Sequence, residues 1–128
     1  MSLIKRIFSV LLSLAMILAG VTHFTMTAAF VAIVPAYLPA ALALVYISGL
    51  IEILLSIALQ VPSLRRMAAW GMIALFIAVL PANINQAMHN IQPPGLEMSP
   101  NMLWIRIGLQ FVLIAWAWWR TRPDHRAA

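Results

Sequence analysis

The sequence predicts an all-α membrane protein, a bundle of four transmembrane helices, on three observations. Hydrophobic residues make up 64% of the 128 residues and charged residues only 9%, whereas soluble domains have roughly half and a quarter. Four apolar runs approach the roughly 20 residues that a helix needs to cross a bilayer. The basic residues separate these runs instead of forming one patch, which argues against a nucleic-acid partner and leaves the lipid bilayer as the expected surroundings.

The four predicted spans form a single domain, residues 1–120, followed by a short cytoplasmic tail, residues 121–128. The spans are residues 3–20, 39–61, 67–83 and 100–119. The first span could instead be a cleaved signal peptide, because Lys5 and Arg6 precede its apolar stretch. No small-x-small cleavage site follows the run directly, which favours an uncleaved anchor.

Prolines are expected to begin the two helices that return to the starting side of the membrane. Proline suits the first helical position because its φ is fixed and it lacks an N–H group, so Pro39 and Pro100 mark these starts. Ser99 should also cap the last helix. An inbound run, a proline-bearing loop and a return helix thus occur twice, which predicts a weak two-plus-two tandem repeat.

The distribution of basic residues predicts the orientation. Seven of the eight Lys and Arg residues lie at the start of the first span, between the second and third spans, or after the fourth. An even number of spans puts these three segments on one side. The segments on the other side, 21–38 and 84–99, contain neither Lys nor Arg. Because Lys and Arg accumulate in short cytoplasmic segments, we expect both termini in the cytoplasm.

Glu52 is the most informative single residue, because a carboxylate near the bilayer centre costs at least about 2.5–3.5 kcal/mol. We therefore expect Glu52 to face the bundle interior, with Ser48 and Ser56 one turn away on the same face. One interpretation is a carboxyl group that carries a proton or binds a ligand. The other is a structural carboxyl group that is neutral or hydrogen-bonded across helices.

Arg106 is the second intramembrane charge, and Gln110 lies one turn further in on the same face. If the two proline-started helices begin at similar depth, Glu52 lies about 10 Å deeper than Arg106 but only about 4 Å deeper than Gln110, at 1.5 Å per residue. Gln110 is therefore the expected direct partner of Glu52. Arg106 should lie nearer the outer mouth, or alternatively extend to the outer headgroups.

The third span carries a face of small residues, which is typical of close helix packing. This face comprises Gly71, Ala74, Ala78 and Ala82. Near the end of the span, Pro81 removes a hydrogen bond to the Ile77 carbonyl and leaves that acceptor available to a polar neighbour. Asn83 follows two residues later.

His23 ends the first span on the face that carries Gly20, so we expect its ring to look into the bundle at the outer mouth. It could bind metal or relay protons, or act only as a polar anchor. A metal site with His89 would require the two outer segments to converge, and no metal site is predicted. The predicted ligand-binding polar pocket therefore consists of His23, Ser48, Glu52, Asn83, Arg106 and Gln110.

Four sequence strings resemble the DoxX-like family of small four-helix membrane proteins, and the resemblance covers nearly the whole chain. The strings are AGVTHF (19–24), VPAYLPAALALVYISGLIEI (34–53), RRMAAWGMIALFIAVLPANI (65–84) and LWIRIGLQFVLIAWAWW (103–119). The polar signature of the family falls on His23, on Ser48 with Gly49 and Glu52, on Pro81 with Asn83, and on Arg106 with Gln110.

The resemblance implies an integral protein of the cytoplasmic (inner) membrane. Some relatives are named as subunits of a thiosulfate:quinone oxidoreductase or as membrane partners of secreted redox enzymes. A thiol-exchange role does not transfer, because this chain has no Cys.

Three hypotheses for function follow, and none of them rests on a visible catalytic constellation, since no nucleophile–base pair, phosphate loop or haem ligand pair is recognisable. The first is a non-catalytic accessory subunit that binds a quinone or small molecule for a redox-enzyme partner. The second is a small proton-coupled transporter in which Glu52 cycles its proton. The third is a purely structural or assembly protein, and a homo-oligomer is the alternative to a redox partner.

Overall fold

The structure, a computed structural model, describes residues 2–92 and 97–122, and the regular structure in this part is entirely helical. The helices are α1 (Leu3–Thr25), α2 (Thr27–Ile33), α3 (Ala41–Ala58), α4 (Arg65–His89) and α5 (Pro100–Arg120). All except α2 are long and apolar enough to cross a membrane. The shortest of these four, α3, extends about 27 Å at 1.5 Å per residue, close to the ~30 Å of a hydrocarbon core. The predicted all-α architecture is confirmed, with four helices that are long and apolar enough to span a membrane.

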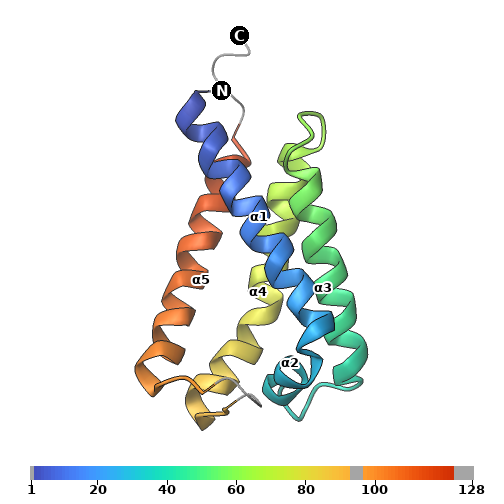
Figure 1. The fold of residues 1–128 in the computed structure, drawn as a ribbon, viewed down its shortest axis with the longest axis vertical. Helices are drawn as coiled ribbons and strands as arrows, with labels where there is room; N and C mark the ends of the chain where they lie inside the picture. The colour runs from blue at the N-terminus through green and yellow to red at the C-terminus, as the bar shows by residue number, and fades with distance from the viewer. Residues whose placement is uncertain (1, 93–96, 123–128) are drawn as a thin grey trace.

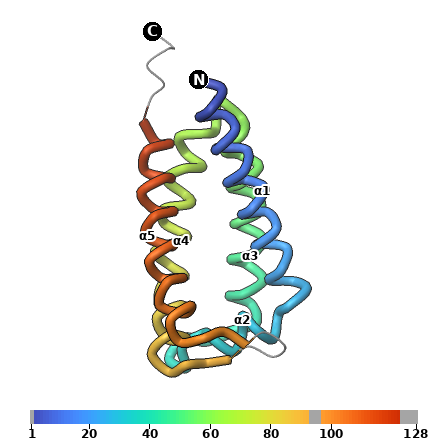
Figure 2. The backbone as a smooth tube through the Cα atoms, turned by 60° about the vertical axis from the view of Figure 1, so that its left-hand side comes forward, coloured from blue at the N-terminus to red at the C-terminus, as the bar shows by residue number. Residues whose placement is uncertain are grey.

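The long helices form two antiparallel pairs, α1 with α3 and α4 with α5 (Figure 1). A short turn, residues 59–64, connects the pairs, and α3 also packs along part of α4. Within the described residues, neither α1 nor α3 packs its backbone against α5. The start of α1, the α3–α4 turn and the end of α5 lie together at what we call the N-terminal end (Figure 2). The opposite end, which we call the loop end, holds α2.

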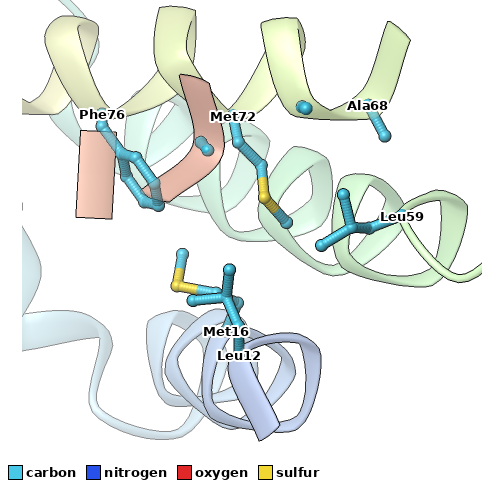
Figure 3. Close-up of a cluster of buried hydrophobic side chains, with 8 residues drawn as sticks. Leu12, Met16, Leu59, Ala68, Met72 and Phe76 are labelled. Carbon is cyan, nitrogen blue, oxygen red and sulfur yellow. The ribbon is translucent and has the colours of Figure 1, made fainter. Parts of the chain in front are cut away.

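A core of apolar side chains joins all four long helices in the half of the bundle nearer the N-terminal end. Figure 3 shows Leu12 and Met16 of α1 pointing toward Met72 and Phe76 of α4. The remaining members of this cluster are Leu59, Ala68, Ala69 and Ala117. A smaller cluster nearer the loop end, which consists of Ala87, Leu103 and Ile107, joins only α4 and α5. The apolar core therefore holds the two pairs together mainly in one half of the molecule.

The outer surface of the long helices is apolar, and many polar side chains lie inside. Leu18, Ile47 and Val112 are 67%, 56% and 62% exposed. The buried polar residues include Ser9, Ser13, His23, Glu52, Ser56, Gln86 and Gln110. This arrangement suits a bilayer, because lipid solvates apolar side chains whereas polar groups must find partners within the protein.

Helical structure extends further into the first outer segment than expected. Helix α1 continues to Thr25 instead of ending at residue 20, and Thr27–Ile33 forms α2 where a loop was predicted. A helix of seven residues is not stable alone. Its stability here comes from packing, since Ile33 is buried and Phe30 is half-buried against the bundle.

Only one of the two expected proline starts is observed. Pro100 begins α5, and Ser99 caps this helix by accepting a 3.3 Å hydrogen bond from the Met102 N–H group. The prediction for Pro39 is wrong, because α3 begins at Ala41. Ala40 adopts a left-handed conformation with φ 55°, which interrupts the helical geometry between Pro39 and the helix.

Helix α4 does not end at residue 83 but continues through Pro81 to His89. Its face of small residues packs against a neighbouring helix over only part of its length, because Ala74 and Ala78 are exposed. At Gly71 a Cβ atom would lie 2.7 Å from Leu55 Cδ2, so the Leu55 side chain of α3 packs closely on this position. The prediction of a small-residue interface is therefore wrong for Ala74 and Ala78.

The C-terminal end of α5 is packed into the bundle. Thr121, the first residue of the predicted tail, is buried and donates a 2.6 Å hydrogen bond to the Trp118 carbonyl. Residues 123–128 of the predicted tail lie outside the described residues.

Candidate functional site

The His23–Glu52 pair is the centre of the candidate site. His23 comes from the last turns of α1 and Glu52 from the middle of α3, and their Nδ1 and Oε2 atoms are 3.8 Å apart. Each side chain keeps only 11% of its surface exposed. Both residues face the interior, as their helix positions predict. The pair thus brings two groups that exchange protons together inside the membrane-spanning helices.

Two glycines allow α1 and α3 to approach closely enough to form this pair. A Cβ atom on Gly49 would lie 2.6 Å from His23 Cβ and 3.1 Å from the Gly20 carbonyl oxygen. A Cβ atom on Gly20 would lie 2.9 Å from the Gly49 carbonyl oxygen. The backbones therefore meet at a point that only glycine fits, and His23 lies directly against it.

The His23 ring is held by two contacts, one to its own helix and one to α2. Nδ1 lies 2.8 Å from the Ala19 carbonyl oxygen, so this nitrogen carries the hydrogen and donates it. The Phe30 ring of α2 stacks on the imidazole with centroids 4.0 Å apart. Helix α2 is in turn attached to α4, because the Asn85 side chain donates a 3.1 Å hydrogen bond to the Ile33 carbonyl. The sequence does not point to Phe30, because the apolar run of the first span ends before it and this segment is predicted to be a loop.

Neither His23 Nε2 nor the Glu52 carboxyl group has a hydrogen-bond partner within residues 2–92 and 97–122. These atoms are therefore the part of the site with unused capacity to bind a ligand or a proton.

Gln110 does not pair with Glu52, so the expected contact between them is wrong. The Gln110 side chain accepts a hydrogen bond from the Asn83 amide and donates a 2.6 Å hydrogen bond to the Phe76 carbonyl. The physical reason is topological, because α5 packs against α4 and not against α3. The expected polar neighbour of the proline-disturbed segment exists, but it binds the carbonyl of Phe76 and not that of Ile77.

Arg106 is bound one turn nearer the loop end. Its guanidinium donates a 2.8 Å hydrogen bond to the Gln86 side-chain oxygen, and Gln86 is only 1% exposed. No salt bridge joins Arg106 to Glu52 among the described residues. Gln86 was missed as a site residue, although its spacing of three residues from Asn83 places both amides on one helix face.

The two serines of the α3 stripe bond to their own helix. Ser48 donates to the Val45 carbonyl at 3.0 Å, and Ser56 donates to the Glu52 carbonyl at 2.7 Å. Such bonds satisfy the hydroxyl groups locally. Ser48 is half-buried and does not contribute a free donor to the pair, so its role in a ligand site is not favoured by the geometry.

A second polar group near the N-terminal end was not identified from the sequence. The Gln60 amide donates to Ser9 Oγ at 3.2 Å, to the Ser9 carbonyl at 3.0 Å and to Ser13 Oγ at 2.7 Å. These bonds join α1 to the turn between α3 and α4. The Gln60 amide and the two serine hydroxyl groups thus bond to one another, which is typical of a structural contact between membrane helices.

The described residues contain no cluster of three His, Cys, Asp or Glu side chains that could hold a metal ion. No curated protein and no solved structure matches the chain. A family model described as "Domain of unknown function (DUF8561)" matches residues 12–121, which include every residue of the candidate site. The chain therefore belongs to this family of domains of unknown function.

Proposed function

We propose that the chain is a DoxX-like, non-catalytic accessory subunit of the cytoplasmic membrane that binds a quinone or a similar small molecule for a redox-enzyme partner. One observation carries the proposal. His23 and Glu52 lie 3.8 Å apart in the membrane-spanning helices, and within the described part of the chain His23 Nε2 and the Glu52 carboxyl group have no hydrogen-bond partner. The other amides of the interior around them are paired with protein groups.

The residues present suit a quinone. A bound quinone would supply reversible uptake of electrons and protons at two ring oxygens. Glu52, when protonated, could donate a hydrogen bond to such an oxygen, and His23 Nε2, which lacks the hydrogen that Nδ1 carries, could accept one from a quinol hydroxyl group. Phe30, stacked on His23, adds an aromatic surface beside these polar groups. Arg106 adds a positive charge on the side of the α4–α5 pair.

We also propose that the N-terminal end faces the cytoplasm, so that the loop end, toward which His23 lies on α1, faces the outside. This orientation rests on the basic residues at the N-terminal end and their absence from the two outer segments. A secreted or periplasmic redox partner would then meet the loop end. Copurification after mild solubilisation tests for such a partner.

Binding of ubiquinone-1 to the purified full-length protein in detergent tests the proposed function. We expect His23→Gln and Glu52→Gln to weaken binding by about tenfold or more, since a hydrogen bond to a charged group contributes roughly 1.5–3 kcal/mol. His89→Gln and Glu97→Gln are matched controls, because both residues are exposed and His89 makes the same bond to a carbonyl four residues earlier as His23. Equal binding by all four variants, or no binding by the wild type, would reject the proposal.

A proton-coupled transporter is the second candidate, and the same pairing of two proton-exchanging groups favours it. Here Glu52 would take up and release a proton, with His23 as its neighbour. Proteoliposomes with a pH-sensitive dye inside separate this candidate from the first. Proton flux that is lost in Glu52→Gln, without ubiquinone-1 binding, would support the transporter, whereas normal stability and no activity in either assay would favour a structural protein.

A further inference from the structure

At the N-terminal end of the molecule, the start of α1 and the end of α5 are joined by aromatic side chains and not by backbone packing. Within the described residues, these two helices have no close backbone contact. Phe8 of α1 meets Trp116 of α5 edge to face with ring centroids 5.6 Å apart, and Trp116 meets Trp119 in the same way at 5.4 Å. We call Phe8, Trp116 and Trp119 the aromatic seam. Tryptophan is enriched at the membrane–water interface, so the seam marks the depth of the lipid headgroups.

Cationic side chains lie on the indole rings at this seam. Lys5 Nζ is 4.8 Å from the centre of the Trp119 ring, and Arg122 Cζ is 4.2 Å from the centre of the neighbouring Trp118 ring. Arg120 also contacts the Trp119 ring, at 5.7 Å. Cation–π contacts of this kind restrict where the charges lie. Lys5 is thus positioned on α1 against the seam, and Arg122, which follows the end of α5, is positioned on the neighbouring Trp118 ring.

No acidic side chain of the described residues accompanies these cations. The acidic residues in this part are Glu52, inside the bundle, and Glu97, which precedes α5 at the loop end. Lys5 and Arg122 form no ion pair within residues 2–92 and 97–122. Positive charges held in place at an interface attract an anion, and the anion present at headgroup depth is a lipid phosphate.

We propose that the aromatic seam and its two cations bind the headgroup of an anionic phospholipid in the leaflet at the N-terminal end. Lys5 and Arg122 contact the phosphate, and the exposed indole of Trp118 packs on the glycerol region. Leu11 and Val112 lie one turn from Phe8 and Trp116 and are 54% and 62% exposed. They offer an apolar surface along which the acyl chains continue toward the membrane centre. This site is separate from the His23–Glu52 pair and does not depend on the function proposed for it.

Two other cations at the same end provide a matched control. Arg6 and Arg66 are exposed, and no aromatic or ion-pair contact is formed by either within the described part of the chain. Removing them lowers the net positive charge by the same amount as removing Lys5 and Arg122. General attraction to an anionic surface responds equally to both changes, whereas a defined site responds only to the second.

Native mass spectrometry of the full chain in detergent, titrated with phosphatidylglycerol, tests the proposal. We expect the double variant Lys5→Gln/Arg122→Gln to lose about tenfold or more in affinity, since each basic residue near an anionic lipid contributes about 1 kcal/mol. Arg6→Gln/Arg66→Gln should lose less than about threefold. The charge-retaining variant Lys5→Arg/Arg122→Lys should bind like the wild type, and thermal unfolding should show that all variants are folded.

Three results would overturn the proposal. The first is an equal loss of affinity in the two charge-removing double variants, which would show diffuse attraction instead of a site. The second is equal binding of phosphatidylglycerol and phosphatidylcholine by the wild type. The third is displacement of phosphatidylglycerol by millimolar inorganic phosphate, which would show that the cations bind a free anion and not a lipid.

Discussion

The position of His23 depends on a residue that has no side chain. Gly49 lies beneath the imidazole, and the space that a methyl group would need there is already filled by His23 and by the backbone of α1. Close helix approach at small residues is the usual means of association in membranes, where no hydrophobic force drives the helices together. At this point the approach also sets the separation between His23 and Glu52.

We expect Gly49→Ala to lower stability by about 1–3 kcal/mol, because the added methyl group would force α1 and α3 apart. The midpoint of thermal unfolding in detergent measures this change. Gly108→Ala is the control, since no atom lies within 4 Å of the Cβ position at this exposed site. That change should leave stability unchanged or raise it by up to about 1 kcal/mol through helix propensity. Similar losses in both variants would contradict the argument.

Gln110 satisfies two groups of α4 at once, the Asn83 amide and the Phe76 carbonyl. Gln110→Leu would leave the Asn83 donor without its partner inside the bundle, and we expect a loss of about 1 kcal/mol. Chemical unfolding followed by helix content measures it. Asn101→Leu, at an exposed site of α5, should change stability much less. No difference between the two variants would mean that the amide contact contributes nothing.

At the scale of elements, α3 begins with an unfavourable residue. Ala40 has φ 55° and ψ 51°, a left-handed conformation that a side chain with Cβ rarely adopts, and no side chain caps the helix there. Glycine adopts this conformation without the steric penalty.

We therefore expect Ala40→Gly to raise the free energy of unfolding by up to about 1 kcal/mol. Ala43→Gly, three residues later in the first turn of α3, should have the opposite sign because glycine disfavours a helix interior. Comparing the unfolding midpoints of the two variants with that of the wild type checks the prediction. It is refuted if Ala40→Gly is as destabilising as Ala43→Gly.

The existence of the four long helices could be predicted from the sequence, because apolar length alone determines it. The burial of Glu52 was also predictable, since lipid penalises an exposed carboxylate wherever the helix neighbours lie. The partner of Glu52 was not. The depth of a residue along its helix can be counted from the sequence, but the helix that packs beside it cannot be identified in this way. The expected contact between Glu52 and Gln110 assumes that α3 lies beside α5, and these two helices do not pack together within the described residues. Because α1 continues to Thr25, His23 lies on this helix and is the residue whose ring is next to the Glu52 carboxyl group.

For the molecule as a whole, the orientation and the weak tandem repeat stay predictions. The chain has no native Cys, so single engineered cysteines report sidedness without background. Ser63→Cys in the exposed α3–α4 turn should resist a membrane-impermeant maleimide added to intact cells, because it lies with the basic residues at the N-terminal end. Tyr37→Cys, at a position 76% exposed near the loop end, should react. The reverse pattern would invert the orientation.

The two antiparallel pairs are also consecutive in the chain, and this affects the order in which charges enter the membrane. During synthesis, α1 and α3 are complete before α4 and α5 exist. Glu52 therefore meets its titratable neighbour, His23, within the half that is made first. Arg106 likewise finds Gln86 within the half that is made second. Each helix pair therefore contains a polar neighbour for its own ionisable side chain. Neither Glu52 nor Arg106 has to stay exposed to lipid until the other helix pair has been synthesised.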